Sequence, residues 1–196
     1  KLPINYEMSS SPVVLSKRLL LRPLGIADIT DAYLQWLNDP GVTRYLEIRH
    51  TPQTYDRVCE YLKQREQMSG CPHFGVFDEN GTRHVGTVTL NALNGYYKTA
   101  DISFVMGHPD ARGKGYATEA VHAVCEYAFT VLQLHKLTGG HYLSHIGSQK
   151  VFQKNGFHQE GIRREQVVNT DGHREDVILH GLLARDFQRN PDLLDR

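Results

Sequence analysis

The glycine-rich segment from Arg112 to Glu119 separates two stretches of different hydrophobic period, and this change limits the folds open to the chain. Upstream, residues 100–106 alternate at period two, which is typical of a β-strand. Downstream, from residue 115 to about 132, apolar side chains recur at spacings of three and four, which is typical of an amphipathic helix. A strand that passes through a glycine-rich turn into a long helix predicts a mixed α/β protein.

Short strands and amphipathic helices are also predicted along the rest of the chain. Asp28 is expected to cap the first helix, and Thr51-Pro52 gives the second helix a cap followed by Pro at its first position. Strands are predicted at residues 17–22, 73–77, 85–90, 99–107, 136–143, 157–168 and 173–183, and helices at 28–37, 51–70, 115–132 and 144–155.

The chain has the length of one domain. Its 196 residues contain no linker or internal repeat, so we expect a single domain over residues 17–190 after an N-terminal tail, residues 1–16. Within this tail, Met8 resembles a native start, and residues 1–7 resemble a short remnant in front of it.

Composition excludes several classes of protein. Hydrophobic residues make up 40% and charged residues 22% of the chain, which is typical of a folded globular protein and not of a disordered one. The 22 basic and 22 acidic residues cancel, so no overall field attracts nucleic acid or an anionic membrane. No apolar run is long enough to span a membrane and no signal-peptide segment is found, so we expect a cytoplasmic protein.

The cysteines and histidines form no metal or disulfide pattern. The 3 cysteines include no CxxC pair, so neither a disulfide framework nor a zinc-thiolate site is predicted, and Cys125 is expected to be a buried structural thiol. His135, His141 and His145 are the densest group among the 11 histidines, but their spacing matches no ligand motif, and we predict no metal.

The turn before the long helix has the composition of an anion-binding site. Gly113 and Gly115 let backbone N–H groups turn toward one ligand, and the N-terminus of a helix adds about half a positive charge. Arg112 and Lys114 would strengthen the attraction, so a pyrophosphate is the ligand that fits. An ordinary glycine-rich turn is the alternative, because the spacing is neither that of a P-loop nor a full GxGxxG.

Two motifs in this sequence resemble those of a known superfamily. Arg112-x-x-Gly115-x-Ala117 is similar to the [QR]-x-x-G-x-[GA] acetyl-CoA loop of the GCN5-related N-acetyltransferases (GNAT), and Asn155-Gly156-Phe157 followed by Glu160-Gly161 is similar to their later signature. The resemblance covers about residues 17–185 and is closest to the branch of the RimJ and RimL ribosomal-protein acetyltransferases. It implies an α/β (α+β) fold with a seven-stranded mixed, mainly antiparallel sheet, splayed fourth and fifth strands and about four flanking helices.

The same resemblance implies acetyl-CoA as the cofactor, with CoA as product. Its pantetheine arm is expected between the splayed strands, and its pyrophosphate on the glycine-rich loop. The implied cofactor-binding residues are Val105, Met106, Arg112, Gly113, Lys114, Gly115, Tyr116, Ala117, Thr118 and His145.

A carboxylate on the strand that leads into this loop is well placed to accept a proton. An alkyl amine is mostly protonated near neutral pH and cannot attack a thioester until it is neutral, so a base is needed. The resembling family often has an acidic general base at this place, where Asp101 stands. The alternative is a solvated or salt-bridged strand carboxylate.

The helix after residue 143 carries the candidate proton donor. His145, Ser148 and Phe152 share one face at spacings of three and seven residues. The family usually has Asn at the position of His145 and often has Tyr, which protonates the departing thiolate, at the position of Phe152. Phe152 has no proton to give, so Ser148 is the candidate donor, with a helix-surface serine as the alternative.

The connector between the first two helices, residues 38–50, is longer and more polar than the topology requires. In the resembling fold this region covers the acceptor pocket, so Glu47, Arg49 and His50 are the candidate acceptor-binding residues. The alternative is that they are rim or salt-bridge residues.

These observations predict direct transfer of an acetyl group from acetyl-CoA to a primary amine of a small molecule such as an amino sugar. One alternative acceptor is the α-amine of a ribosomal or other protein. A non-catalytic acyl-CoA-binding module is an alternative of another class. The expected partners are acetyl-CoA and the amine, with no nucleic acid and no membrane, and the expected state is a monomer or homodimer.

Overall fold

The computed structural model describes residues 12–68, 71–78 and 80–196. The expected remnant at residues 1–7 and start at Met8 lie outside the described residues, as do the helix end at Ser69-Gly70 and the turn residue Glu79. Among the described residues the strands are β1 (Val14–Leu15), β2 (Leu19–Pro23), β3 (His73–Asp78), β4 (His84–Asn94), β5 (Thr99–Met106), β6 (Lys136–Tyr142), β7 (His158–Val168) and β8 (Arg174–Leu183).

Six α-helices and four short 3₁₀ helices accompany these strands in the described part of the chain. Helices α4 and α5 are the predicted long helix and its successor, each ending within two residues of the expected place. The helices are α1 (Asp31–Leu37), α2 (Pro40–Thr43), α3 (Tyr55–Gln67), α4 (Tyr116–Thr130), α5 (Ile146–Lys154) and α6 (Pro191–Leu194), and the 3₁₀ turns are η1 (Ile26–Asp28), η2 (Glu47–His50), η3 (Pro109–Ala111) and η4 (Ala184–Asp186).

One sheet organises the molecule, with strand order β1-β2-β3-β4-β5-β6-β8-β7. Every neighbouring pair is antiparallel except β5 and β6, which run parallel. The predicted mixed, mainly antiparallel GNAT sheet is confirmed. It has eight strands instead of seven, because the short β1 adds to one edge.

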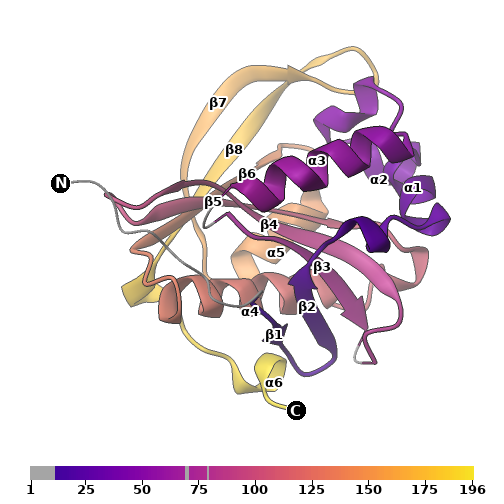
Figure 1. Cartoon of the computed structure of the whole chain (residues 1–196). Coiled ribbons are helices and arrows are strands. Elements are labelled where there is room, and N and C mark those ends of the chain that lie inside the picture. Colours follow the sequence, from indigo (N-terminus) through magenta and orange to yellow (C-terminus); the bar gives the residue numbers. More distant parts are fainter. Residues whose placement is uncertain (1–11, 69–70, 79) are drawn as a thin grey trace.

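Helices cover both faces of the sheet: α4 lies on one face and α1 to α3 lie on the other (Figure 1). The alternation of β5 decides which of its residues meet each layer, because successive side chains point to opposite faces. Ile102 belongs to the core cluster under α4, and Val105 packs against the cluster formed by α1 and α3. Asp101 and Ser103 share the face of Val105 and therefore lie on the side of α1 to α3.

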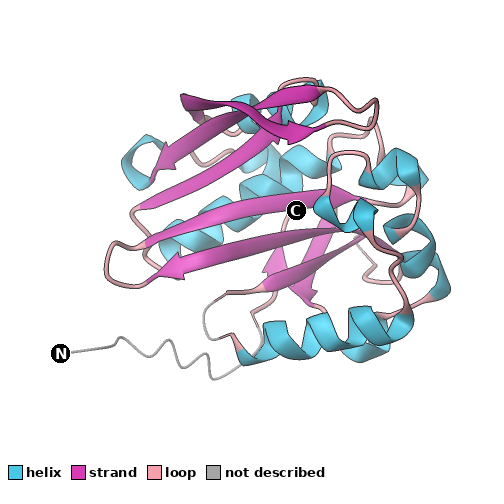
Figure 2. Ribbon diagram, turned by 90° about the horizontal axis from the view of Figure 1, so that it is seen from above, coloured by secondary structure: helices cyan, strands magenta, loops and turns pink. Residues whose placement is uncertain are grey.

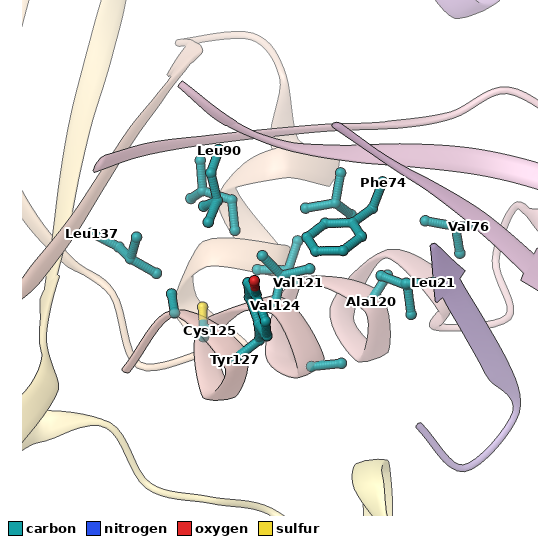
Figure 3. Packing of buried hydrophobic residues seen from close by; sticks show 14 of the residues in the cluster. Leu21, Phe74, Val76, Leu90, Ala120, Val121, Val124, Cys125, Tyr127 and Leu137 are labelled. Atoms are coloured by element: carbon teal, nitrogen blue, oxygen red, sulfur yellow. The ribbon is translucent and has the colours of Figure 1, made fainter. Parts of the chain in front are cut away.

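The main core forms where the apolar stripe of α4 meets β2, β3 and β4 (Figure 3). Val121 and Val124 are fully buried in the helix, and Phe74 and Leu90 are fully buried in the sheet. Burial of one such side chain is worth about 1.5–3 kcal/mol, so this layer holds α4, and the loop before it, in a fixed place.

Strands β5 and β6 separate soon after they meet, as the resemblance implied. They pair only from Thr99 to Asp101 of β5 with Lys136 to Thr138 of β6. A Cβ atom on Gly139 would lie 2.6 Å from the ring of Phe152, so only glycine allows this aromatic ring to approach β6. Figure 2 shows the two groups of strands diverging, with a helix behind the sheet visible between them.

The first two helices begin later than predicted. Thr30 caps α1 by accepting a hydrogen bond from the Tyr33 N–H at 3.2 Å, because both carboxylate oxygens of the predicted cap, Asp28, are bound by Arg22. Thr54 caps α3 by accepting a hydrogen bond from the N–H of Arg57 at 3.4 Å, three residues after the predicted Thr51.

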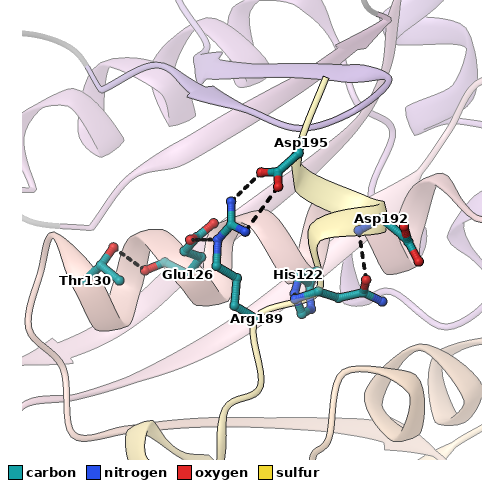
Figure 4. A network of polar contacts seen from close by, with 7 residues as sticks. His122, Glu126, Thr130, Arg189, Asp192 and Asp195 are labelled. Atoms are coloured by element: carbon teal, nitrogen blue, oxygen red, sulfur yellow. Dashed lines mark hydrogen bonds and ion pairs between the residues drawn. The ribbon is translucent and has the colours of Figure 1, made fainter.

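Both ends of the domain extend beyond the predicted limits of 17 and 190. β1 lies within the expected tail, and the side chain of Leu194 in α6 is buried against the main core. Arg189 lies between Glu126 of α4 and Asp195, which holds the last residues against that helix (Figure 4). No helix in the described ranges is long and apolar enough to cross a membrane.

Candidate active site

A cleft of about 1390 Å³ lies where β5 and β6 separate. Side chains from both faces of the sheet line it, so it connects the side of α4 and α5 with the side of α1 to α3. Its lining includes Trp36, Tyr45, Glu47, Asp101, Val105, Met106, Arg112, Gly113, Gly115, Tyr116, Ala117, Thr118, Thr138, Tyr142, His145, Ser148 and Phe152.

The glycine-rich loop forms one wall of this cleft. Gly113 and Gly115 have φ angles of +72° and +79°, in the left-handed region that favours glycine, and Gly115 is the cap of α4. A Cβ atom on Gly113 would meet nothing within 4 Å, so the space beside the backbone is open. The N-terminus of the 15-residue helix α4 adds positive potential at the same place. These residues fit a phosphate group.

The loop is held from behind by an ion pair that the sequence analysis did not identify. Glu119 is fully buried and accepts hydrogen bonds from the Arg18 N–H at 2.6 Å and from Arg18 Nε at 2.7 Å. Arg18 Nη1 also donates to the carbonyl of Lys114 at 3.1 Å. Lys114 is the loop residue that does not line the cleft, and its contact with the cofactor stays a prediction.

Asp101 lies in the cleft on the side of α1 to α3. Its carboxylate accepts a hydrogen bond from Thr138 Oγ1 at 3.1 Å, across the last paired position of β5 and β6. Burial raises the pKa of Asp101, while the Thr138 hydrogen bond and the charge of Arg163 oppose this shift. A half-buried carboxyl group with a raised pKa is able to accept and release a proton.

His145 is the cap that precedes α5, whereas the sequence predicted it to lie within the helix. Its Nδ1 accepts a hydrogen bond from the Ser148 N–H at 2.9 Å, and its pKa is lowered by burial. The neutral ring therefore carries its proton on Nε2, which lies 3.4 Å from Ser148 Oγ. Ser148 Oγ can accept this proton in a hydrogen bond, and the hydroxyl proton of Ser148 stays free to face the cleft.

Phe152 is buried, with 1% of its surface exposed, and packs against Phe104, Phe157 and His180. It belongs to the core as much as to the cleft wall. Its ring cannot serve as an acid, as the sequence indicated.

The connector residues separate into two groups. Glu47 lines the cleft and accepts a hydrogen bond from the Tyr142 hydroxyl at 2.8 Å. Arg49 does not line the cleft: Nη2 donates to the carbonyl of Val168 at 2.8 Å, and Nη1 donates to the Tyr142 hydroxyl at 3.1 Å. His50 is exposed, 3.8 Å from Glu47, and also lies outside the lining. The structure thus brings Glu47, but not Arg49 or His50, to the predicted pocket.

Several buried polar residues of the cleft were missed by the sequence analysis. His141 Nε2 and His180 Nε2 lie 3.0 Å apart, on β6 and β8. His73 Nδ1 lies 2.7 Å from Thr89 Oγ1, and burial lowers the pKa of His73 to about 3. The sequence showed the alternation of side chains along these strands, but it did not show which strands become neighbours in the sheet.

Cys125 lies outside the cleft, whereas His141 and His145 of the predicted histidine group line it. Cys125 is fully buried, and burial raises the pKa of its thiol, so it is a structural residue. Across residues 12–68, 71–78 and 80–196, no group of three or more His, Cys, Asp or Glu side chains is arranged to hold a metal ion.

Comparison with known families and relatives identifies the chain. The family described as an acetyltransferase (GNAT) domain matches residues 18–158. The chain belongs to the GNAT family. Among GNAT relatives, "Probable N-acetyltransferase YjcK" of Bacillus subtilis (strain 168) is 39% identical over 180 residues, which cover 88% of this chain and 98% of the relative. "Putative ribosomal N-acetyltransferase YdaF" of the same organism is 22% identical over 174 residues, 86% of this chain and 91% of the relative.

A solved GNAT structure shares the fold. The spermidine N-acetyltransferase from Vibrio cholerae, crystallised with CoA and spermine, aligns with a TM-score of 0.76 and 23% identity, covering 86% of this chain and 96% of that chain. The protein is an N-acetyltransferase, as the sequence resemblance implied, and its family uses acetyl-CoA.

Proposed function

We propose that this protein transfers the acetyl group of acetyl-CoA to the primary amine of a small molecule such as an amino sugar. The observation that carries this proposal is the connector, residues 38–50, over the acceptor side of the cleft. The connector lies over that side, and Arg49 joins it to the end of β7 through the carbonyl of Val168. Tyr45 extends the cover by packing on His145, with ring centroids 4.1 Å apart.

The cofactor side of the cleft suits acetyl-CoA. Acetyl-CoA supplies an acetyl group that is already activated as a thioester. The N–H groups between Arg112 and Thr118 would bind its pyrophosphate, with the open space at Gly113 leaving room for it. Val105 and Met106 line the cleft beyond the last residue of β5 that pairs with β6, so the backbone groups of this segment that point away from β4 are available for hydrogen bonds to the pantetheine arm.

Asp101 and Ser148 would handle the protons of the reaction. Asp101 takes a proton from the ammonium form of the acceptor, directly or through one water, and leaves the neutral amine that attacks. Ser148 donates its hydroxyl hydrogen bond toward the departing sulfur, because its oxygen is already oriented by His145. A thiol has a pKa of about 8.5, so a hydrogen bond is sufficient help for its departure near neutral pH.

The alternative acceptor, the N-terminus of a protein, would need an open groove toward the last hairpin, near residues 166–176. That is the place where Arg49 Nη2 binds the Val168 carbonyl, so the connector restricts access for a polypeptide. The Vibrio cholerae structure with spermine shows that this fold can serve a small amine in that protein.

The test is an acetylation screen with purified protein and acetyl-CoA. The release of CoA thiol is measured with a panel of free primary amines, including amino sugars, and with peptides that begin with ribosomal-protein sequences. We expect saturable turnover of free amines and no modified peptide by mass spectrometry. Peptide acetylation without free-amine turnover would favour the protein acceptor, and CoA binding without thiol release from any acceptor would favour a non-catalytic module.

A further inference from the structure

The charged side chains that line the cleft are nearly all paired. Arg112 lies 3.8 Å from Asp39, and Glu160 accepts two hydrogen bonds from Lys136, at 2.6 and 2.7 Å. Glu47 is bound by the Tyr142 hydroxyl. Arg163 is the exception: it lines the cleft, and no hydrogen bond or ion pair joins it to any residue that the structure describes.

The strand register explains why Arg163 points into the cleft. Arg163 of β7 pairs with Val177 of β8, and Val177 pairs with Tyr142 of β6. Directly paired residues place their side chains on the same face of a sheet, so all three belong to the face that carries Tyr142. The Tyr142 hydroxyl contacts both Glu47 and Arg49, so this is the face beneath the connector.

Arg163 and the cofactor loop therefore come from opposite sides of the sheet. The loop precedes α4, whereas β7 and β8 curve toward the side of α1 to α3 in Figure 1. Arg163 shares its side with Asp101, and the two are close enough for the charge of Arg163 to oppose part of the rise that burial causes in the pKa of Asp101. A cation and a carboxylate thus face the same acceptor space.

The surface between these two groups is apolar. Val177 and Leu179 of β8 line it, and a Cβ atom on Gly140 of β6 would lie 3.4 and 3.5 Å from their side chains. The absence of a side chain at Gly140 lets both apolar residues approach β6. An acceptor in this space would have its carbon skeleton against Val177 and Leu179, with polar groups at each end.

From these contacts we infer that the acceptor is an amine that also carries an anionic oxygen group, a carboxylate or a phosphate, and that Arg163 binds this group while the amine lies at Asp101. This inference rests on the proposed small-molecule function. A guanidinium binds either anion through two parallel hydrogen bonds. A diamine would instead bring a second ammonium group toward Arg163, where the like charges repel.

The experiment compares matched acceptors in steady-state kinetics. β-Alanine is compared with its uncharged amide, glucosamine 6-phosphate with glucosamine, and 1,3-diaminopropane serves as the cationic acceptor. We expect kcat/KM for at least one anionic acceptor to exceed that of its uncharged partner by about 10- to 100-fold, the usual effect of one charge-assisted contact. The pair that shows the preference distinguishes a carboxylate acceptor from a phosphate acceptor.

Variants at two neighbouring arginines make the test specific. Arg163→Ala should raise the KM of the anionic acceptor by about 10- to 100-fold and leave the KM of acetyl-CoA and of the uncharged partner unchanged. Arg163→Lys should keep part of the preference, because it keeps the charge. Arg164→Ala is the matched control, since Arg164 is the next residue of β7 and does not line the cleft.

Four results would overturn the inference. One is an equal loss for charged and uncharged acceptors in Arg163→Ala, and another is a wild-type preference for 1,3-diaminopropane. If uncharged amines are acetylated with the same kcat/KM as anionic ones, the inference fails while the proposed function stands. If no free amine is acetylated and peptides are, both fail together.

Discussion

Asp101 is expected to support catalysis at the expense of stability. Asp101→Asn should lower kcat/KM by about 100-fold or more, because the amine then loses its proton acceptor. Burial raises the pKa of Asp101, so its charged form destabilises the folded state near neutral pH. Removing that charge should raise the free energy of unfolding.

Both effects can be measured on one preparation of each variant. The loss of kcat/KM should shrink as the pH rises from 6 to 9, because more of the free amine is then present without a base. Asp101→Glu, which keeps a carboxylate, should retain part of the activity. A loss of stability in Asp101→Asn, measured by urea unfolding, would instead indicate a structural ion pair.

The sequence was sufficient to place residues whose direction follows from their local context. Asp101, Ser148 and the residues around Gly113 and Gly115 line the cleft because strand alternation and the turn fix their direction. It failed for Arg49, since a long side chain can reach several partners and its contact with the Val168 carbonyl depends on the fold of a distant hairpin.

At the scale of helices and strands, the type of element was predictable and its start was not. Asp28 and Thr30 are both good caps by residue type. Thr30 is the cap in the structure, because Arg22 binds the Asp28 carboxylate. Residues 38–50 were expected to be a connector, but Asp39 caps the short helix α2 by accepting from the Gly41 N–H at 2.7 Å.

The loop before α4 gives a prediction at this scale. Gly113→Glu should weaken CoA binding at least 10-fold, because it puts a negative side chain into the open space where we expect the pyrophosphate. Gly172→Glu is the matched control: its φ is +82°, its Cβ would also meet nothing within 4 Å, and it lies in the turn between β7 and β8.

The two variants carry the same backbone strain and the same added charge, and each should lose about 1 kcal/mol of stability. Calorimetric titration with CoA separates them. If Gly172→Glu weakens CoA binding as much as Gly113→Glu does, the loop has no special role and the phosphate site lies elsewhere.

At the scale of the whole molecule, the cleft depends on contacts that no single segment of sequence contains. The loop before α4 approaches from one face of the sheet, and Tyr142, Val177 and Arg163 approach from the other. The two sets meet because β5 and β6 diverge after Asp101. The resemblance to a known superfamily implied this divergence, whereas the periodicity of the chain alone did not.

The stability of the whole molecule should fall between pH 7 and pH 5, because buried histidines must stay neutral in the folded state. Burial lowers the pKa of His73 to about 3 and that of His84 to about 4. In the unfolded chain each titrates near 6.5, so their contribution is complete above that pH and is lost as the pH falls toward their folded pKa values.

At pH 5 each of these two histidines should lower the free energy of unfolding by about 2 kcal/mol relative to pH 7, by the usual relation between pKa and stability. Burial also lowers the pKa of His122, His145 and His180, which adds to the loss with the same sign. Urea unfolding at pH 7 and pH 5 measures the difference directly. In His84→Gln the difference in unfolding free energy between the two pH values should shrink by about 2 kcal/mol. The control is His158→Gln, which replaces an exposed histidine and should leave this difference unchanged. Equal stability of the wild type at pH 7 and pH 5 would contradict the argument.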